Sequence, residues 1–251
     1  MFFSYDHLKF RYKPFPIGLA KPLMEEDTYR ALLDNYPPLE CFADLAKVGH
    51  KYSLSEKFNS REYKSLIQSR PVWREFHRWI KSDAFIGGVL DALKAHHIDL
   101  GFDLSVSPAK RLVKNIKNVM LGHGGRSSRR LRARFEFSML PADGGHILPH
   151  TDSPSKVVTL IVSIVDGDEW DPRFGGGTDI NVPKHIRNSF NRLNQQARFE
   201  DMDVLDTYAF TPNQAVVFVK TFNSWHSVRP MQGAGSSAMR KTLTINIETN
   251  G

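Results

Sequence analysis

The hydrophobic pattern of this 251-residue chain changes its period near residue 132, and this change constrains the fold more than any other feature. From Arg132 onward, polar residues alternate with the apolar residues Ala133, Phe135, Phe137 and Met139. A period of two is typical of a strand with one buried face. Before this point, apolar residues follow the spacing of a helix face, as in Tyr29, Leu32, Leu33 and Tyr36. The pattern predicts a helical layer followed by a β-sheet core.

Two helix starts are marked in the first part of the chain. Pro71 suits the first turn of a helix, and Ser82 can cap the helix that follows. The first helix would bury Val72, Trp73, Phe76, Trp79 and Ile80, and the second Phe85, Ile86, Val89, Leu90 and Leu93. We interpret these side chains as core. We expect residues 1–105 to form mainly helical support on the outside of a sheet.

Short apolar runs continue the β pattern in the second half of the chain. They span residues 157–165, 215–219 and 242–248, and glycine or proline clusters such as Gly175-Gly176-Gly177 separate them. Several short strands with this punctuation indicate a sandwich or jelly-roll. A further helix is compatible with the sequence only over residues 183–196. The expected fold is therefore mainly β with helices (α+β).

Length and composition indicate a single domain over residues 1–251. The hydrophobic content of 41% is enough for a sizeable core, and the single cysteine, Cys41, excludes an internal disulfide and suits a reducing compartment. The first residues lack the regions of a signal peptide. No apolar run approaches the roughly 20 residues that span a bilayer. We expect a cytoplasmic protein without membrane contact, and the sequence leaves its oligomeric state open.

The net charge of +7 is concentrated in one stretch. Residues 110–134 contain nine Lys or Arg and no Asp or Glu, and glycines and serines within them indicate a loop, which we place at 106–131. One interpretation is a basic rim that attracts an anionic substrate. The other is an ordinary solvated loop. Nucleic-acid binding has less support, because no aromatic residues are interleaved with the charges.

Three residues form a candidate metal site. His150 and Asp152 are two positions apart, so on a strand they would share one face, and His226 would come from a distant strand folded back beside them. Two histidines and one carboxylate leave half an octahedron open, as in the facial triad of non-haem Fe(II) oxygenases. The alternatives are an ordinary loop histidine at position 150 and a structural histidine beside Trp225 at position 226.

The order of these motifs resembles the Fe(II)- and 2-oxoglutarate-dependent oxygenases, in particular the prolyl 4-hydroxylase-like branch. The resemblance rests on His150 and Asp152, the glycine turn at 175–177, His226, and Arg240 on the last strand. The segment Pro14-Phe15-Pro16 is also similar to the family's opening. The resemblance implies a double-stranded β-helix (jelly-roll) core over residues 132–251 with an N-terminal helical layer.

The resemblance also implies how a co-substrate would be held. His150, Asp152 and His226 would bind Fe(II), Arg240 would anchor the distal carboxylate of 2-oxoglutarate, and Thr242 would place a hydroxyl beside it. Strand parity favours Arg240 over its neighbour, because it shares a polar face with Thr242, Thr244 and Asn246, whereas Lys241 shares an apolar face with Leu243, Ile245 and Ile247.

Two features depart from the family's pattern. The gap between His226 and Arg240 is long, which leaves Arg229 as a lesser candidate for the anchor. Leu140 stands ten residues before His150, where the prolyl hydroxylase branch often has a tyrosine that contacts 2-oxoglutarate. This second departure argues against a prolyl substrate but not against 2-oxoglutarate as the co-substrate.

The function that the resemblance implies is a dioxygenase, and most simply a hydroxylase. It would use Fe(II), 2-oxoglutarate and O₂, with ascorbate as a further cofactor that the family allows. Its substrate would be a peptide or a small molecule, including an anionic or sugar-linked one. Two alternatives remain: a cupin-like metal enzyme that does not use 2-oxoglutarate, and a non-catalytic phosphate- or nucleic-acid-binding protein.

Overall fold

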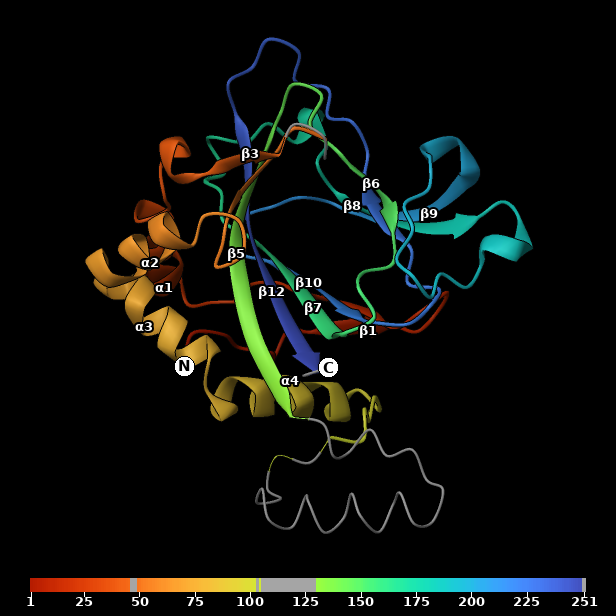
Figure 1. Ribbon diagram of the computed structural model, residues 1–251, viewed down its shortest axis with the longest axis horizontal. Helices are drawn as coiled ribbons and strands as arrows, with labels where there is room; N and C mark the ends of the chain where they lie inside the picture. Colours follow the sequence, from red (N-terminus) through yellow and green to blue (C-terminus); the bar gives the residue numbers. More distant parts are fainter. Residues whose placement is uncertain (46–48, 103, 105–129, 250–251) are drawn as a thin grey trace.

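The computed structural model describes residues 1–45, 49–102, 104 and 130–249. Four α-helices lie within these residues, and all of them precede the long central strands (Figure 1). They are α1 (Glu26–Asp34), α2 (Ser60–Ser69), α3 (Pro71–Ile80) and α4 (Asp83–Ala95). As predicted, Pro71 opens α3, and the Ser82 hydroxyl accepts a hydrogen bond from the Phe85 amide at 3.3 Å to cap α4.

The strands form two antiparallel sheets. The larger sheet has the order β1-β2-β10-β7-β12-β5-β4-β3. It comprises β1 (Lys9–Arg11), β2 (Ile17–Ala20), β3 (Ala43–Leu45), β4 (Lys51–Leu54), β5 (Leu131–Pro141), β7 (Lys156–Ser163), β10 (Ala215–Val219) and β12 (Met239–Thr249). The smaller sheet has the order β6-β11-β8-β9 and comprises β6 (Ile147–His150), β8 (Thr178–Pro183), β9 (Met202–Tyr208) and β11 (His226–Val228). The chain crosses repeatedly between the two sheets, which gives the expected double-stranded β-helix.

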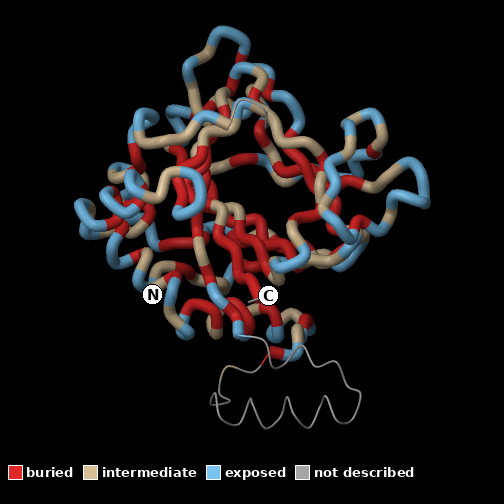
Figure 2. The backbone as a smooth tube through the Cα atoms, viewed as in Figure 1, coloured by how far each residue is buried: buried red, intermediate tan, exposed pale blue. Residues whose placement is uncertain are grey.

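The helices cover the outer face of the larger sheet, and the smaller sheet lies on its other side (Figure 1). Leu243, Ile245 and Ile247 of β12 belong to the same hydrophobic cluster as the buried faces of the helices. Trp73 of α3 lies against Phe137 of β5, with ring centroids 4.6 Å apart. Burial is continuous between the helices and the central strands (Figure 2). The apolar parity of β12 therefore faces the helices, and its polar parity faces the interior between the sheets.

The N-terminal segment departs in one respect from its predicted helical character. Besides the four helices, it supplies β1 to β4, which extend the larger sheet at both of its ends. These strands are only three or four residues long, too short for a clear period-two pattern. None of the helices in the described part of the chain is long and apolar enough to cross a membrane.

The helix that the sequence allowed over residues 183–196 does not form. Only a single 3₁₀ turn forms there, η4 (Ile186–Asn188). The Asn191 side chain donates to the Gln195 carbonyl at 2.7 Å and accepts from the Gln195 amide at 2.9 Å. These bonds replace those that a helix would make with its own backbone. Other 3₁₀ turns are η1 (Leu39–Cys41), η3 (Pro172–Phe174) and η5 (Phe199–Asp201).

Most of the basic stretch lies outside the described residues, because residues 105–129 are not among them. Its predicted loop at 106–131 and its position relative to the site stay predictions. The described end of the stretch enters β5 at Leu131, and Arg134 there pairs with Glu248 of β12 at 2.8 Å.

Candidate metal centre

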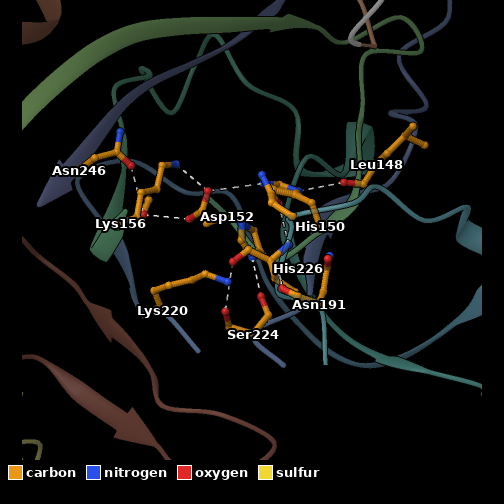
Figure 3. Close-up of polar contacts among 12 residues, drawn as sticks. Leu148, His150, Asp152, Lys156, Asn191, Lys220, Ser224, His226 and Asn246 are labelled. Carbon is orange, nitrogen blue, oxygen red and sulfur yellow. Dashed lines mark hydrogen bonds and ion pairs between the residues drawn. The ribbon is translucent and has the colours of Figure 1, made fainter. Parts of the chain in front are cut away.

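Pairing of β6 with β11 places two histidines side by side. His150, the last residue of β6, is the register partner of His226, the first residue of β11, and their ring centroids are 4.3 Å apart. Asp152 follows immediately, and one ligand atom from each of the three residues lies within 4.8 Å of the others. Figure 3 shows the three side chains converging. The structure thus brings together all three residues that the sequence predicted as metal ligands.

Both imidazole rings are held in the same orientation by main-chain carbonyls. Nδ1 of His150 lies 3.0 Å from the carbonyl oxygen of Leu148, and Nδ1 of His226 lies 3.0 Å from that of Ser224. A carbonyl oxygen only accepts hydrogen bonds, so Nδ1 carries the proton in each ring and Nε2 keeps its lone pair. The two Nε2 atoms are therefore ready to bind a cation.

Asp152 reaches the cluster by a different route from the one predicted. β6 ends at His150, and Asp152 has a φ of 69°, in the left-handed region rather than on a strand. The assumption of an extended His-Thr-Asp segment is therefore wrong, although its consequence for the site is the same. Lys156 donates to Oδ1 of Asp152 at 2.5 Å, and the Thr159 hydroxyl donates to Oδ2 at 2.9 Å. These contacts fix the carboxylate.

Burial and neighbouring charges set the protonation of the three groups. Burial, followed by the proximity of His226, lowers the pKa of His150 to about 3. Burial also lowers the pKa of His226. Burial alone would raise the pKa of Asp152, but Lys156 and the two histidines more than offset it, so this pKa is lowered. At neutral pH the site consists of two neutral imidazoles and one carboxylate, the donor set of a non-haem Fe(II) site.

A cavity of about 120 Å³ between the sheets opens onto these ligands. Arg240 lines it together with Ser138, Thr242 and Thr244. Only 5% of Arg240 is exposed, and within the described chain no carboxylate lies within ion-pair distance of it. Its Nε donates to the Gly176 carbonyl at 2.5 Å, and its guanidinium lies 4.6 Å from the Phe210 ring centroid. A buried cation without a counter-ion is costly, so this end of the cavity suits an anion.

The glycine turn makes this arrangement possible. Gly176 has a φ of 75°, and a Cβ there would lie 2.9 Å from the Trp170 ring and 3.2 Å from Cδ of Arg240. Glycine adopts this conformation without strain and leaves the space that the two side chains occupy. The predicted tight turn is present, and it also shapes the pocket around Arg240.

Neither alternative basic residue is free in the same way. Arg229 donates to Oδ2 of Asp179 at 3.0 Å, and its side chain is 57% exposed. Lys241 points to the other side of β12, where it pairs with Glu169 at 2.8 Å. Leu140 lines the cavity and is the register partner of Arg240, so an apolar surface stands where the resemblance suggests a tyrosine.

Two features of the cavity were not predicted from the sequence. Lys51 of β4 forms a partly buried ion pair with Glu136 of β5 at 2.5 Å, and both residues line the cavity. Lys156, the first residue of β7, also lines the cavity and contacts Asp152 directly. The parity used for β12 would have identified Glu136, which shares the inner face of β5 with Ser138, whereas the partner on β4 has no comparable signal.

In sequence, the chain matches no protein-family model and no curated protein. Its structure resembles a Pseudomonas putida prolyl-4-hydroxylase, which is 14% identical, with 93% of this chain and 92% of that chain covered and a TM-score of 0.44. HygX from Streptomyces hygroscopicus, solved with nickel, 2-oxoglutarate and hygromycin B, is 10% identical, with 92% and 82% covered and a TM-score of 0.48. A Burkholderia pseudomallei oxidoreductase of the 2OG-Fe(II) oxygenase family is 15% identical, with 54% and 57% covered and a TM-score of 0.31. At these identities and TM-scores, the likenesses do not decide the activity of this chain.

Proposed function

We propose that this protein is an Fe(II)- and 2-oxoglutarate-dependent dioxygenase that hydroxylates its substrate. One observation carries the proposal: the buried cluster of His150, Asp152 and His226 shares a cavity with Arg240, a buried cation without a carboxylate partner among the described residues. In a metal enzyme that binds no anionic co-substrate, such a cation would stay buried without an anion to offset the cost of its burial. The same feature favours 2-oxoglutarate chemistry over a cupin-like reaction without it.

The residues divide into two sets with separate tasks. His150, Asp152 and His226 would hold Fe(II), with the two Nε2 atoms and one carboxylate oxygen as ligands. Arg240 would hold the distal carboxylate of 2-oxoglutarate, since a guanidinium matches a carboxylate in bidentate geometry, and Thr242 lines the same cavity from the same face of β12. Bound together, Fe(II) and 2-oxoglutarate supply the oxidation of a C–H bond by O₂, with release of succinate and CO₂.

The surrounding side chains orient these groups and exclude water. Lys156 and Thr159 fix both oxygens of Asp152, and Phe218 stacks on His226 with ring centroids 4.3 Å apart. These contacts hold the ligands in place before the metal arrives, so little ordering is needed on binding. Leu140 gives no hydrogen bond to a co-substrate, and we therefore leave the prolyl specificity aside and propose hydroxylation without naming the acceptor.

The experiment is a succinate-release assay with Fe(II), 2-oxoglutarate and ascorbate over a panel of peptide, sugar-linked and anionic small molecules. Anaerobic binding of 2-oxoglutarate to the Fe(II) protein, followed by the visible charge-transfer absorption of a chelated 2-oxo acid, tests the site without a substrate. We expect Asp152→Ala to lose both signals. Asp203→Ala, an exposed carboxylate on β9, is the matched control and should keep them. Retention of full metal binding and turnover by Asp152→Ala would contradict the assignment.

A further inference from the structure

A second cavity, of about 340 Å³, adjoins the metal cavity. Lys156 lines both of them. The second cavity is also lined by Lys220, Phe190, Phe222, Phe102 and Asn223. Its volume falls within the range typical of small-molecule sites. An occupant would therefore lie beside Lys156, the residue that pairs with Asp152.

The charged groups that line this cavity are all positive. Its described lining contains two lysines and neither Asp nor Glu. Lys220 is half-buried, and its ammonium donates to the Thr221 carbonyl at 2.9 Å. Within the described chain no carboxylate lies within ion-pair distance of Lys220, and burial lowers its pKa. Figure 3 shows Lys156 and Lys220 both extending toward the ligand cluster.

Metal binding would leave these cations short of negative charge. Asp152 is the acid paired with Lys156, at 2.5 Å, and it also acts electrostatically on Lys220. Under the proposed function, the same carboxylate would serve a divalent cation. The two negative charges of 2-oxoglutarate would be engaged by the metal and Arg240. Two lysines that line the second cavity would then share one carboxylate with the metal, so the charge balance calls for an anion.

Apolar surface beside the lysines indicates what the anion is attached to. Phe190 is 73% exposed and Phe222 is 43% exposed, although both line the cavity. The Lys220 ammonium lies 5.6 Å from the Phe222 ring centroid, and the Arg192 guanidinium lies 5.8 Å from it. Exposed aromatic rings next to unpaired cations suit a molecule with an apolar body and a charged end.

We propose that this cavity binds the substrate, and that the substrate is a small organic anion whose carboxylate or phosphate pairs with Lys220 and Lys156 while an aromatic or alkyl body lies against Phe222 and Phe190. This inference rests on the proposed function, since it names the substrate class of the same site. It differs from the predicted role of the basic stretch, because Lys156 and Lys220 lie outside residues 110–134.

The test is calorimetric titration of the protein loaded with Mn(II) and saturating 2-oxoglutarate, so that the Arg240 end is filled. The probes are 3-phenylpropionate, phenyl phosphate and the neutral 3-phenylpropan-1-ol. We expect one or both anions to bind at least about ten-fold more tightly than the alcohol, since hydrogen bonds to charged groups are the stronger ones. The tighter of the two anions identifies the charged group. Equal affinity for all three probes would overturn the proposal.

Variants locate the binding. Lys220→Met should weaken binding of the preferred anion about ten-fold or more without changing the affinity for the alcohol. Lys220→Arg should retain most of the affinity for the anion. Lys184→Met, an exposed lysine on the loop after β8, removes the same charge outside the cavity and should change nothing. Unchanged anion affinity in a folded Lys220→Met protein would overturn the proposal.

Metal and 2-oxoglutarate binding, measured on the same samples, separate the two hypotheses. If both bind and the anions do not, the substrate inference is wrong and the proposed function stands. If neither binds but the anions still require Lys220, the anion site stands and the dioxygenase assignment is wrong.

Discussion

At the scale of single residues, the site depends on groups that are not themselves ligands. The carbonyls of Leu148 and Ser224 fix the tautomers of the two histidines, and Lys156 and Thr159 hold the carboxylate of Asp152 in place by hydrogen bonds. Arg240 shows the opposite case, a buried charge without a carboxylate partner in the described chain. Substituting each of these residues therefore tests one part of the site separately.

We predict that Arg240→Met weakens 2-oxoglutarate binding by at least about thirty-fold, because losing one partner of a buried charge pair costs roughly 2–5 kcal/mol. Titration of the Mn(II)-loaded protein with 2-oxoglutarate measures this, and metal affinity should stay nearly unchanged. Lys241→Met is the control, since it removes a neighbouring charge on the opposite face of β12. Weaker binding in Lys241→Met than in Arg240→Met would reverse the assignment of the faces.

How much of the site could be read from the sequence depended on whether a residue obeys a repeating geometry. Arg240 could be separated from Lys241 because polar and apolar residues alternate along β12 from Thr242 to Glu248. Asp152 was found through its spacing, but its left-handed backbone could not be foreseen, because a single residue's φ is set by the contacts around it. Lys51 could not be found, since its role depends on which strand β5 pairs with.

At the scale of elements, β4 and β5 are tied together inside the cavity by Lys51 and Glu136. Burial by itself would raise the pKa of Glu136, but Lys51, with smaller effects from Lys156 and Arg134, more than offsets it and the pKa is lowered. A carboxyl whose pKa is lower in the folded state adds stability above its unfolded pKa of about 4.3, and that stability is lost as pH falls through this region.

Lys51→Met should therefore reverse the pH dependence that Glu136 contributes. Without its main partner, the buried carboxyl has a raised pKa, so its contribution to the free energy of unfolding should fall as pH rises from 5 to 7. At pH 7 we expect a loss of about 1–3 kcal/mol, since the Glu136 carboxylate is buried but its partner is only partly so. Urea denaturation at both pH values measures this. Lys241→Met breaks a more exposed pair and should lower the free energy of unfolding by less than about 1 kcal/mol. A loss in Lys51→Met that is no larger than this would contradict the prediction.

The contact of α3 with the sheet gives a second prediction at this scale. Trp73 is fully buried against Phe137, and its Nε1 donates to the Asn35 carbonyl at 2.6 Å. Trp73→Ala should lower the free energy of unfolding by about 3–5 kcal/mol. Trp79→Ala, on the same helix but only partly buried, should cost clearly less. Urea denaturation of both variants makes the comparison, and a larger loss at Trp79 would place the centre of the core wrongly.

The helices of this layer could be predicted because propensity, capping and apolar spacing agree over a full turn or more. The short strands β1 to β4 could not, since three or four residues hold too little pattern. The helix allowed over residues 183–196 does not form for a different reason. The side chain of Asn191 there makes hydrogen bonds to the backbone that replace those of a helix.

At the scale of the whole molecule, the metal ligands join segments that are far apart in the chain, so metal binding should stabilise the entire fold. A ligand that binds only the folded state at one hundred times its dissociation constant adds about 2.7 kcal/mol. For a domain of this size we expect a rise in Tm of about 5–10 °C. Calorimetry with Mn(II) and with a chelator measures the shift. Asp152→Ala should show almost none, and an equal shift in that variant would point to metal binding elsewhere.

The position of β12 in the larger sheet has a consequence for biosynthesis. It lies between β5 and β7, yet it follows both of them in the chain. While a ribosome is still adding residues before Met239, each of these neighbours has an open edge, the kind of surface that invites pairing with other chains. Arg240 and the polar wall beside it are also still missing. Closure of the larger sheet and completion of the cavity by Arg240 therefore both wait until β12 has been made.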